Sequence, residues 1–430
     1  MSETTTDKLL ETLERKTAAY FIHETNQDNG LVLDRTDGDA PASIAATGMG
    51  LASYPVAVER GYLARADAIQ RTLTCLRFFW HSPQGTEKDA TGYKGFYYHF
   101  LDMKTGRRVW KSELSSVDTT FLLAGMLTVA EYFTRDTVEE REIRTLATEL
   151  FERVDWQWML NGGPTVSHGW KPERGFIRYR WQGYSEALLL YALGLGSPTH
   201  PLPAESYAAW TSSYRWKKIY GTELLYSGPL FTHQLSHIWI DTRGIQDAYM
   251  RDKHLDYFEN TRRATALQRN YAIRNPRKFT GYCETCWGFT ASDGPGRVTR
   301  MVDGVERRFY DYVSRGAPFG PDDGTISPWA VVASLPFAPE IVLPAIEQFH
   351  ALKLIDPNPY GFKVSFNQTF PDENGGTNGW VASGHCGINQ GPILLMIENH
   401  RSELVWRLMR KSRYLSNGLR RAGFAGGWLD

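Results

Sequence analysis

The apolar residues of this chain recur in paired segments with two different helical patterns. The first segment of a pair, as in residues 47–60 and 117–133, is apolar nearly all round and rich in Gly, Ala and Ser. The second, as in residues 64–80 and 137–160, carries charged residues on one face. A helix that is apolar all round is buried, whereas a helix with one charged face lies at the surface. The pairs therefore predict buried inner helices covered by outer helices.

Further segments extend this pattern along the chain. An amphipathic segment at 9–24 precedes the first pair, and further helical segments are 185–195, 326–335 with 338–354, and 389–401 with 402–415. We expect inner helices to begin near Thr47, Asp118, Glu186, Pro328 and Asn389. Residues expected to be buried on them are Gly50, Gly125, Leu189, Ala333 and Leu395. The spacing is too irregular for a solenoid repeat.

Long segments rich in Gly, Trp and Tyr connect the pairs. They are residues 96–116, 162–183, 226–244 and 282–321, with short strands expected at 95–103 and 176–181. Long ordered loops in a compact domain are usually functional. Since no low-complexity linker marks a boundary, the sequence predicts a single all-α domain over residues 1–430.

Charge and cysteine content restrict the function classes. Lys plus Arg and Asp plus Glu both number 48, and this balance argues against nucleic acid as a partner. The first residues lack the basic start and apolar run of a secretory signal, and no stretch of about 18 apolar residues predicts a membrane span. Four cysteines are too few for a disulfide framework. We therefore expect a cytoplasmic protein without a membrane partner.

Aromatic residues and two acids suggest carbohydrate chemistry. Trp, Tyr and Phe make up 13% of the chain, and a surplus of rings suits a groove that binds the apolar faces of sugars. Asp118 and Glu186 each stand at the expected start of an inner helix beside an aromatic loop. Acids there also offset the helix dipole, but glycoside hydrolysis needs two such carboxyl groups across one bond.

Metal and cofactor signals are weak. Cys283 and Cys286 form a C-x-x-C pair, but zinc would need two further ligands. His233 and His237 are four residues apart without the H-E-x-x-H pattern of a zinc protease. P-loop, G-x-S-x-G and dinucleotide-binding patterns are absent from the sequence. We expect neither a metal nor a cofactor.

Several short motifs resemble one known family. They are GLVLDR at 30–35, SVDT at 116–119, YSEA at 184–187, GSPTHP at 196–201, PLF at 229–231, SHIWIDTR at 236–243, WGFTASDGP at 287–295, DGTISP at 323–328, NQGP at 389–392 and IEN at 397–399. Together they resemble the bacterial glucoamylase-like group that includes β-1,2-glucanases. This group is distantly similar to the transglycosylating domain of cyclic β-1,2-glucan synthases. The resemblance covers residues 15–412.

The resemblance implies a single (α/α)6 barrel that hydrolyses or transglycosylates β-1,2-glucan or its oligosaccharides. It implies Glu186 as the general acid. Because Asp118 opens the preceding inner helix, we expect it at the same rim, as the base or as a group that orients the substrate. The family usually has Asp before Gln-Gly-Pro, whereas this chain has Asn389, whose amide cannot act as a base. Two alternatives remain open: a catalytically silent glucan-binding protein, and a sugar isomerase or epimerase on the same barrel.

Polar and aromatic residues inside or beside these motifs are the expected substrate-binding groups. They are Asp34, Arg35, Glu113, Tyr184, His237, Trp239, Asp241, Arg243, Glu284, Trp287, Asp293, Asn389 and Gln390. In particular, Tyr184, Trp239 and Trp287 are expected to line one cleft. Asp241, Arg243 and Gln390 are expected in the same cleft.

Overall fold

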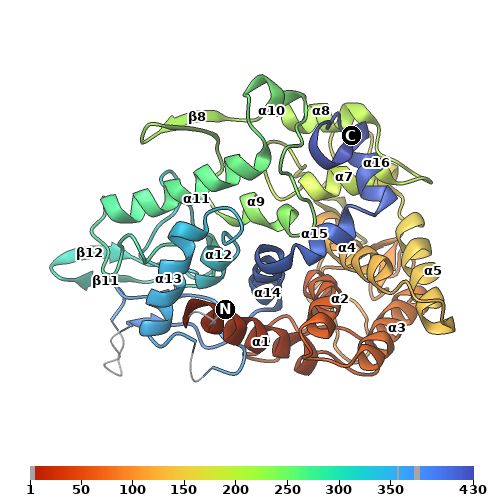
Figure 1. The fold of residues 1–430 in the computed structure, drawn as a ribbon, viewed down its shortest axis with the longest axis horizontal. Helices are drawn as coiled ribbons and strands as arrows, with labels where there is room; N and C mark the ends of the chain where they lie inside the picture. The colour runs from red at the N-terminus through yellow and green to blue at the C-terminus, as the bar shows by residue number, and fades with distance from the viewer. Residues whose placement is uncertain (1–4, 356–357, 372–377) are drawn as a thin grey trace.

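The computed structural model describes residues 5–355, 358–371 and 378–430, and helices dominate it (Figure 1). The helices that are buried along most of their length are α2 (Ile44–Glu59), α4 (Ser116–Tyr132), α7 (Leu188–Gly196), α12 (Pro328–Val332) and α14 (Gly387–Ser402). They coincide with the segments predicted to be inner helices. The residues expected to be buried on them are all buried: Gly50, Gly125, Leu189, Ala333 and Leu395.

The buried helices are packed in a continuous order. Helix α12 packs on α14, α14 on α2, α2 on α4, and α4 on α7. A short helix, α9 (Phe231–Gln234), and the 3-10 helix η1 (Leu235–Ile238) connect the two ends of this series. Ser236 Oγ donates a hydrogen bond to the backbone oxygen of Glu186, and Gln234 Nε2 donates one to that of Ala330 at 2.6 Å.

Glycines allow the closest of these approaches. A Cβ atom added to Gly125 on α4 would overlap the backbone carbonyl of Gly48 on α2, and one added to Gly48 would overlap the backbone of Phe121. Protein interiors are packed too densely to absorb such an atom without a shift. The small residues of the inner segments therefore serve close helix packing.

Amphipathic helices cover the buried ones. They are α1 (Thr5–His23), α3 (Arg65–His81), α5 (Val138–Glu152), α11 (Tyr257–Arg274), α13 (Pro339–Ala351) and α16 (Arg413–Arg421). Helix α5 buries Ile143 and Leu150, while its Glu139 is exposed. Shorter helices are α6 (Trp156–Met159), α8 (Ala204–Thr211), α10 (Ala248–Asp252), α15 (Leu404–Met409) and η2 (Gly427–Leu429).

Some predicted helix boundaries were wrong. The segment 137–160 is divided into α5 and α6, and 402–415 is divided between α15 and α16. Helix α11 was missed because its inward face carries polar residues such as Asn260, Thr265 and Gln268, which weaken the apolar stripe. Helix α7 begins at Leu188, so Glu186 lies in the preceding loop.

Short antiparallel strands hold the connecting loops. The pairs are β1 (Ala42–Ser43) with β4 (Phe100–Leu101), β2 (Gly92–Tyr93) with β3 (Phe96–Tyr97), β8 (Trp216–Ile219) with β9 (Thr222–Leu225), β10 (Ala291–Ser292) with β13 (Val313–Ser314), β11 (Thr299–Val302) with β12 (Val305–Arg308), and β14 (Phe366–Asn367) with β15 (Trp380–Val381). Strands β5 (Leu114–Ser115), β6 (Gly169–Lys171) and β7 (Gly175–Phe176) form a three-stranded sheet.

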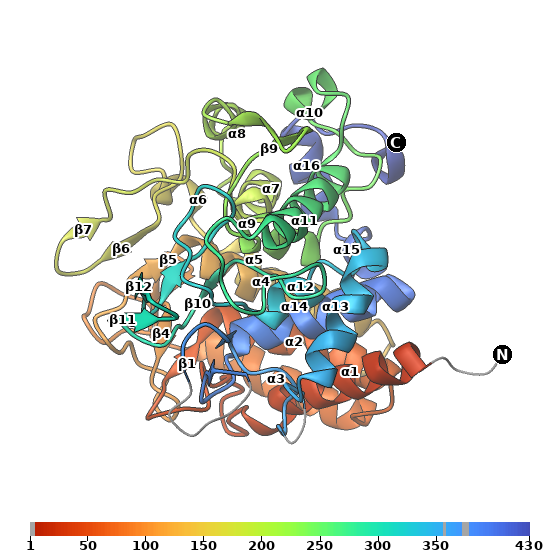
Figure 2. The same cartoon turned by 90° about the vertical axis from the view of Figure 1, so that its left-hand side faces the viewer.

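The strands are concentrated where inner helices begin. Strand β1 runs directly into α2, and β5 runs directly into α4. In register, Ser43 faces Phe100 and Ser115 faces Gly169. Figure 2 shows β1 and β4 to β7 on one side of the molecule, away from the N-terminus. The strand pairs therefore fix the loops around the N-terminal ends of the inner helices. Within the described residues, no helix has the length and apolar character to cross a membrane.

Candidate active site

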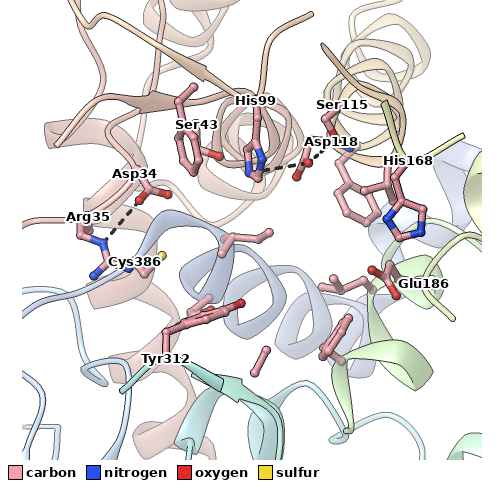
Figure 3. Close-up of a pocket in the computed structure, with 18 of the residues that line it drawn as sticks. Asp34, Arg35, Ser43, His99, Ser115, Asp118, His168, Glu186, Tyr312 and Cys386 are labelled. Atoms are coloured by element: carbon pink, nitrogen blue, oxygen red, sulfur yellow. Dashed lines mark hydrogen bonds and ion pairs between the residues drawn. The ribbon is translucent and has the colours of Figure 1, made fainter. Parts of the chain in front are cut away.

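A cavity of about 460 Å³ opens at the N-terminal ends of the inner helices (Figure 3). Its lining includes Ser43, Ser115 and Cys386, which are the residues that precede α2, α4 and α14. This volume lies within the range of small-molecule binding sites. The cavity is therefore a candidate ligand site built from segments that are far apart in sequence.

Asp118 is held rigidly in the first turn of α4. Ser115 Oγ accepts a hydrogen bond from the Asp118 backbone N–H at 3.2 Å and donates one to Asp118 Oδ2 at 2.5 Å. His99 Nε2 lies 3.6 Å from the same carboxyl oxygen (Figure 3). The Asp118 side chain is largely buried. Its orientation in the cavity is consequently fixed by both the helix cap and the imidazole.

His99 is held between two acids. Its Nδ1 lies 2.9 Å from Glu113 Oε1, and its ring stacks on Phe100 with centroids 4.0 Å apart. Burial alone would lower the pKa of His99, but the negative charges of Asp118, Glu113 and Asp34 outweigh it and raise the pKa to about 9. Burial would likewise raise the pKa of Glu113, but the hydrogen bond and charge of His99 lower it to about 2. His99 is therefore an imidazolium at neutral pH.

Glu186 lies on a different side of the cavity from His99 (Figure 3). The side chain is half-buried, and no Lys or Arg among the described residues forms an ion pair with its carboxyl group. Burial raises the pKa of Glu186 to about 7, and the negative charge of Asp118 contributes to the increase. A substantial fraction of Glu186 thus carries a proton at neutral pH, as a general acid requires.

Arg35, paired with two aspartates, forms another side of the cavity. Arg35 Nη1 lies 3.1 Å from Asp293 Oδ2, and its Nε lies 3.4 Å from Asp34 Oδ2. Burial raises the pKa of Asp34, although Arg35 and His99 oppose this increase. Cys386 lies beside the pair (Figure 3), and burial raises the pKa of its thiol, which leaves it protonated. These groups offer hydrogen bonds to a polar ligand rather than a nucleophile.

Aromatic rings complete the cavity. His168 stacks on Trp181 with centroids 3.9 Å apart, and Trp181 Nε1 donates a hydrogen bond to Ser116 Oγ at 2.9 Å. Tyr312, which is 62% exposed, overhangs the cavity opposite His99 (Figure 3). Flat rings beside carboxyl and guanidinium groups match the apolar faces and polar edges of a sugar.

The cavity brings together some of the residues predicted from sequence. Those that line it are Asp34, Arg35, Glu113, Asp118, Glu186 and Asn389. Asp293 does not line the cavity itself but forms an ion pair with Arg35, which does. Among the lining residues that the sequence did not single out, five are aromatic or histidine side chains of the connecting loops: His99, Phe100, His168, Trp181 and Tyr312. All five lie in the aromatic loops 96–116, 162–183 and 282–321, so loop composition was the available signal.

Other expected binding residues lie elsewhere, which corrects the prediction of a shared cleft. Trp239 and Trp287 are fully buried in the hydrophobic core. Tyr184 stacks on Tyr257, and His237 is buried between Thr242 and Thr261. Glu284 is exposed and pairs with Arg269, while Gln390 is buried and donates to the backbone oxygen of Phe362. These side chains stabilise the fold or the surface around the site.

Asp241 and Arg243 lie at the opposite end of the inner helices. Arg243 pairs with Asp241 and with Glu403, and Glu403 follows the last residue of α14. Asn389, by contrast, is in the first turn of that 16-residue helix and lines the cavity. Since an α-helix rises 1.5 Å per residue, the two ends are about 20 Å apart. The expectation that Asp241 and Arg243 share the groove was therefore wrong.

The C-x-x-C pair shows no sign of a ligand set. Cys283 and Cys286 are free thiols that contact each other through backbone hydrogen bonds of 3.3 Å. In residues 5–355, 358–371 and 378–430, no group of three or more His, Cys, Asp or Glu side chains is arranged to hold a metal ion.

Comparisons with known proteins agree with this architecture. A family model described as "Putative glucoamylase" matches residues 178–413. A crystal structure of a putative glucoamylase from Bacteroides uniformis is 31% identical, covers 100% of both chains and has a TM-score of 0.87. An endo-β-1,2-glucanase structure from Chitinophaga pinensis, with sophorotriose and glucose, is 26% identical over 99% of this chain and 100% of that one, with a TM-score of 0.84.

A curated relative is similar over nearly the whole chain. It is an exo β-1,2-glucooligosaccharide sophorohydrolase (non-reducing end) from Parabacteroides distasonis, 26% identical over 454 residues that include 97% of this chain. This chain spans only 58% of that relative's length. The family model nevertheless matches more than half of this chain, and the Bacteroides uniformis protein exceeds 30% identity over all of it. The chain therefore belongs to the family described as putative glucoamylases.

Proposed function

We propose that this chain hydrolyses β-1,2-glucan or its oligosaccharides, with Glu186 as the proton donor and Asp118 as its partner carboxylate. One observation carries the proposal. Among the carboxyl groups that line the cavity, Asp118 lies beside the His99 imidazolium, whereas burial raises the pKa of Glu186 to about 7. Carboxyl groups whose environments differ in this way are typical of glycosidases.

The chemistry follows from this difference. Protonated Glu186 donates its proton to the glycosidic oxygen as the bond to the leaving sugar breaks. Asp118, fixed by Ser115 and His99, takes a proton from the attacking water, directly or through a substrate hydroxyl, and the water oxygen bonds to the anomeric carbon in place of the leaving sugar. Asn389 lines the same cavity, and its amide binds hydroxyl groups but accepts no proton. The base is therefore assigned to Asp118.

The substrate class rests on the relatives and on the chemistry of the lining. The Chitinophaga pinensis and Parabacteroides distasonis proteins are named for activity on β-1,2-linked glucans. In this chain, Asp34 and Arg35 supply hydrogen-bonding groups, and Trp181 and Tyr312 supply flat rings. Such a lining suits a neutral, hydroxyl-rich ligand. We propose hydrolysis as the reaction. Transglycosylation of the same substrate is the alternative reaction, and analysis of the products distinguishes the two.

The same proposal covers the architecture. The contacts that connect α12, α14, α2, α4, α7 and α9 in order, with amphipathic helices outside, support a single (α/α)6 barrel spanning the chain. The four cysteines are all free thiols, which supports the expected cytoplasmic location.

A product screen tests the function. Wild-type protein is incubated with linear and cyclic β-1,2-glucans, and with laminarin and cellodextrins as controls, and the products are separated by chromatography. We expect shorter β-1,2-linked products from the β-1,2-glucans alone, formed about 10²–10⁴-fold more slowly by the Glu186→Gln variant. Failure of the wild type to convert any β-1,2-glucan would overturn the proposal.

A second candidate function is a glucan-binding protein without catalysis. The observation in its favour is Asn389, which stands in the cavity where relatives are expected to carry Asp. Calorimetric titration with the same glucans distinguishes the two. Binding of a β-1,2-glucan without any product would establish this second function in place of hydrolysis.

A further inference from the structure

Trp110 lies on the surface next to the cavity. Its side chain is 62% exposed, and its ring centroid is 5.1 Å from that of Phe100, which lines the cavity. Phe100 in turn stacks on His99 at 4.0 Å, and His99 contacts Asp118. A line of rings thus extends from the surface to the candidate catalytic carboxylate.

The backbone that carries Trp110 is strained. Trp110 has φ 55° and Lys111 has φ 48°, so two consecutive residues with side chains occupy the left-handed region. Such conformations cost free energy and persist only where the surroundings impose them. In this conformation the large apolar ring of Trp110 is exposed to solvent, although burial of the ring would stabilise the fold.

Hydrogen bonds on both sides of Trp110 hold the turn in place. Val109 N–H donates to the Phe100 carbonyl at 3.1 Å, and Ser112 N–H donates to the Val109 carbonyl at 3.0 Å. Arg108 Nε donates to the Ser112 carbonyl at 2.6 Å, and the buried Arg108 guanidinium is anchored in turn by Glu173. The indole is therefore presented by a fixed turn, so a ligand that packs on it orders little of the chain.

We infer that Trp110 is a binding platform for a glucosyl unit of the glucan chain that lies outside the cavity, on the side of His99. The inference rests on the proposed function, and it adds a subsite beyond the cavity. The apolar face of a pyranose packs on the exposed face of the indole, while the preceding sugar unit occupies the cavity beside Phe100. The platform consequently favours substrates long enough to reach it.

Another exposed aromatic residue provides a matched control. Tyr220, in the turn between β8 and β9, is 37% exposed and also has a positive φ of 52°. The Arg274 guanidinium lies 4.3 Å from its ring centroid, and Tyr220 is not part of the cavity lining. Both residues thus have an exposed ring and a positive φ, but only Trp110 adjoins the cavity.

The test compares Trp110→Ala with Tyr220→Ala on β-1,2-glucooligosaccharides of increasing length. Alanine retains Cβ, so each variant keeps the backbone strain of its parent. For Trp110→Ala we expect the KM relative to wild type to increase with the length of the oligosaccharide. On chains that reach the platform the increase should be about tenfold, which corresponds to about 1.4 kcal/mol. We expect kcat to change little, because Trp110 does not touch the reacting bond. Tyr220→Ala should match the wild type at every length.

A further variant guards against a folding defect. Trp110→Phe keeps a flat ring and should retain most of the affinity for long chains, whereas a general loss of folding would affect all chain lengths equally. Equal KM values for Trp110→Ala and the wild type, or an increase independent of length, would overturn the platform while the wild type still hydrolyses glucan. A wild type that neither hydrolyses nor binds any β-1,2-glucan would instead overturn the proposed function, and the platform with it.

Discussion

Replacement of Glu186 by glutamine should affect activity and stability in opposite directions. The amide keeps the size of the carboxyl group but has no proton to donate to the leaving oxygen. General acid catalysis typically contributes 10²–10⁴-fold, so we expect kcat to fall by about that factor. Binding of glucan should persist, because Asp118, Arg35 and the aromatic lining remain.

The stability change follows from the pKa of Glu186. Burial raises this pKa from 4.5 to about 7, so the folded state binds the proton more tightly than the unfolded chain does. The folded state is penalised as pH rises from 4.5 through 7, and the full penalty applies above 7. That shift corresponds to up to about 3 kcal/mol. Glu186→Gln removes the ionisable group and should therefore be more stable than the wild type at pH 8.5 and equally stable at pH 4.

Two assays on the same preparations measure these effects. Release of reducing sugar from β-1,2-glucan gives kcat, and thermal unfolding at pH 4 and pH 8.5 gives the stability difference. We expect a midpoint a few degrees higher for the variant at pH 8.5 only. Glu284→Gln is the matched control, because this glutamate is exposed, lies outside the cavity and pairs with Arg269. The control should keep the wild-type kcat and show no gain in stability at pH 8.5.

Either assay can refute the reasoning. A Glu186→Gln protein that folds, binds glucan and hydrolyses it at the wild-type rate would exclude Glu186 as the acid. A lower unfolding midpoint at pH 8.5 would show that the carboxylate is stabilised in the folded protein, contrary to the raised pKa that burial gives Glu186.

Two further predictions concern neighbouring residues. His99 has a pKa raised from 6.5 to about 9, so its stabilising charge is present below pH 6.5 and is lost as pH rises through 9. His99→Gln should lower the free energy of unfolding by up to about 3 kcal/mol at pH 6 and by little at pH 10, as measured by urea denaturation; an equal loss at both pH values would contradict a charged His99. Asn389→Asp should leave kcat no higher than in the wild type, because Asp118 already supplies the carboxylate; an increase of about tenfold or more would place the base at position 389 instead.

The sequence by itself determined the two classes of helix and the position of the key acids along the chain. Segments apolar all round became α2, α4, α7, α12 and α14, because burial on every side is the only way to remove such a surface from water. Asp118 and Glu186 line the cavity since both stand at the start of an inner segment. These features depend on local periodicity, which can be recognised without knowledge of the fold.

Only the tertiary structure decided which loop residues complete the site. Trp181 and Trp239 both lie in the aromatic connecting segments, at 162–183 and 226–244, but Trp181 lines the cavity while Trp239 packs in the core against Phe121. Asp241 resembled a site acid in sequence, yet it lies at the far end of the inner helices. The local sequence does not distinguish the residues that line the cavity from those that do not. An aromatic or acidic residue in a loop has the same sequence neighbours whether the fold turns it toward the cavity or away from it.

The protonation states also required the three-dimensional arrangement. His99 carries its charge because Glu113 and Asp118, 14 and 19 residues along the chain, meet its two ring nitrogens. The pKa of Glu186 is raised to about 7 because the elements around the cavity bury its carboxyl group, and no Lys or Arg of the described residues forms an ion pair with it. A pKa depends on burial and on distances between charges, and these are properties of packed elements rather than of sequence neighbours. The sequence could therefore place Asp118 and Glu186 near one rim, whereas the raised pKa of Glu186 depends on the fold.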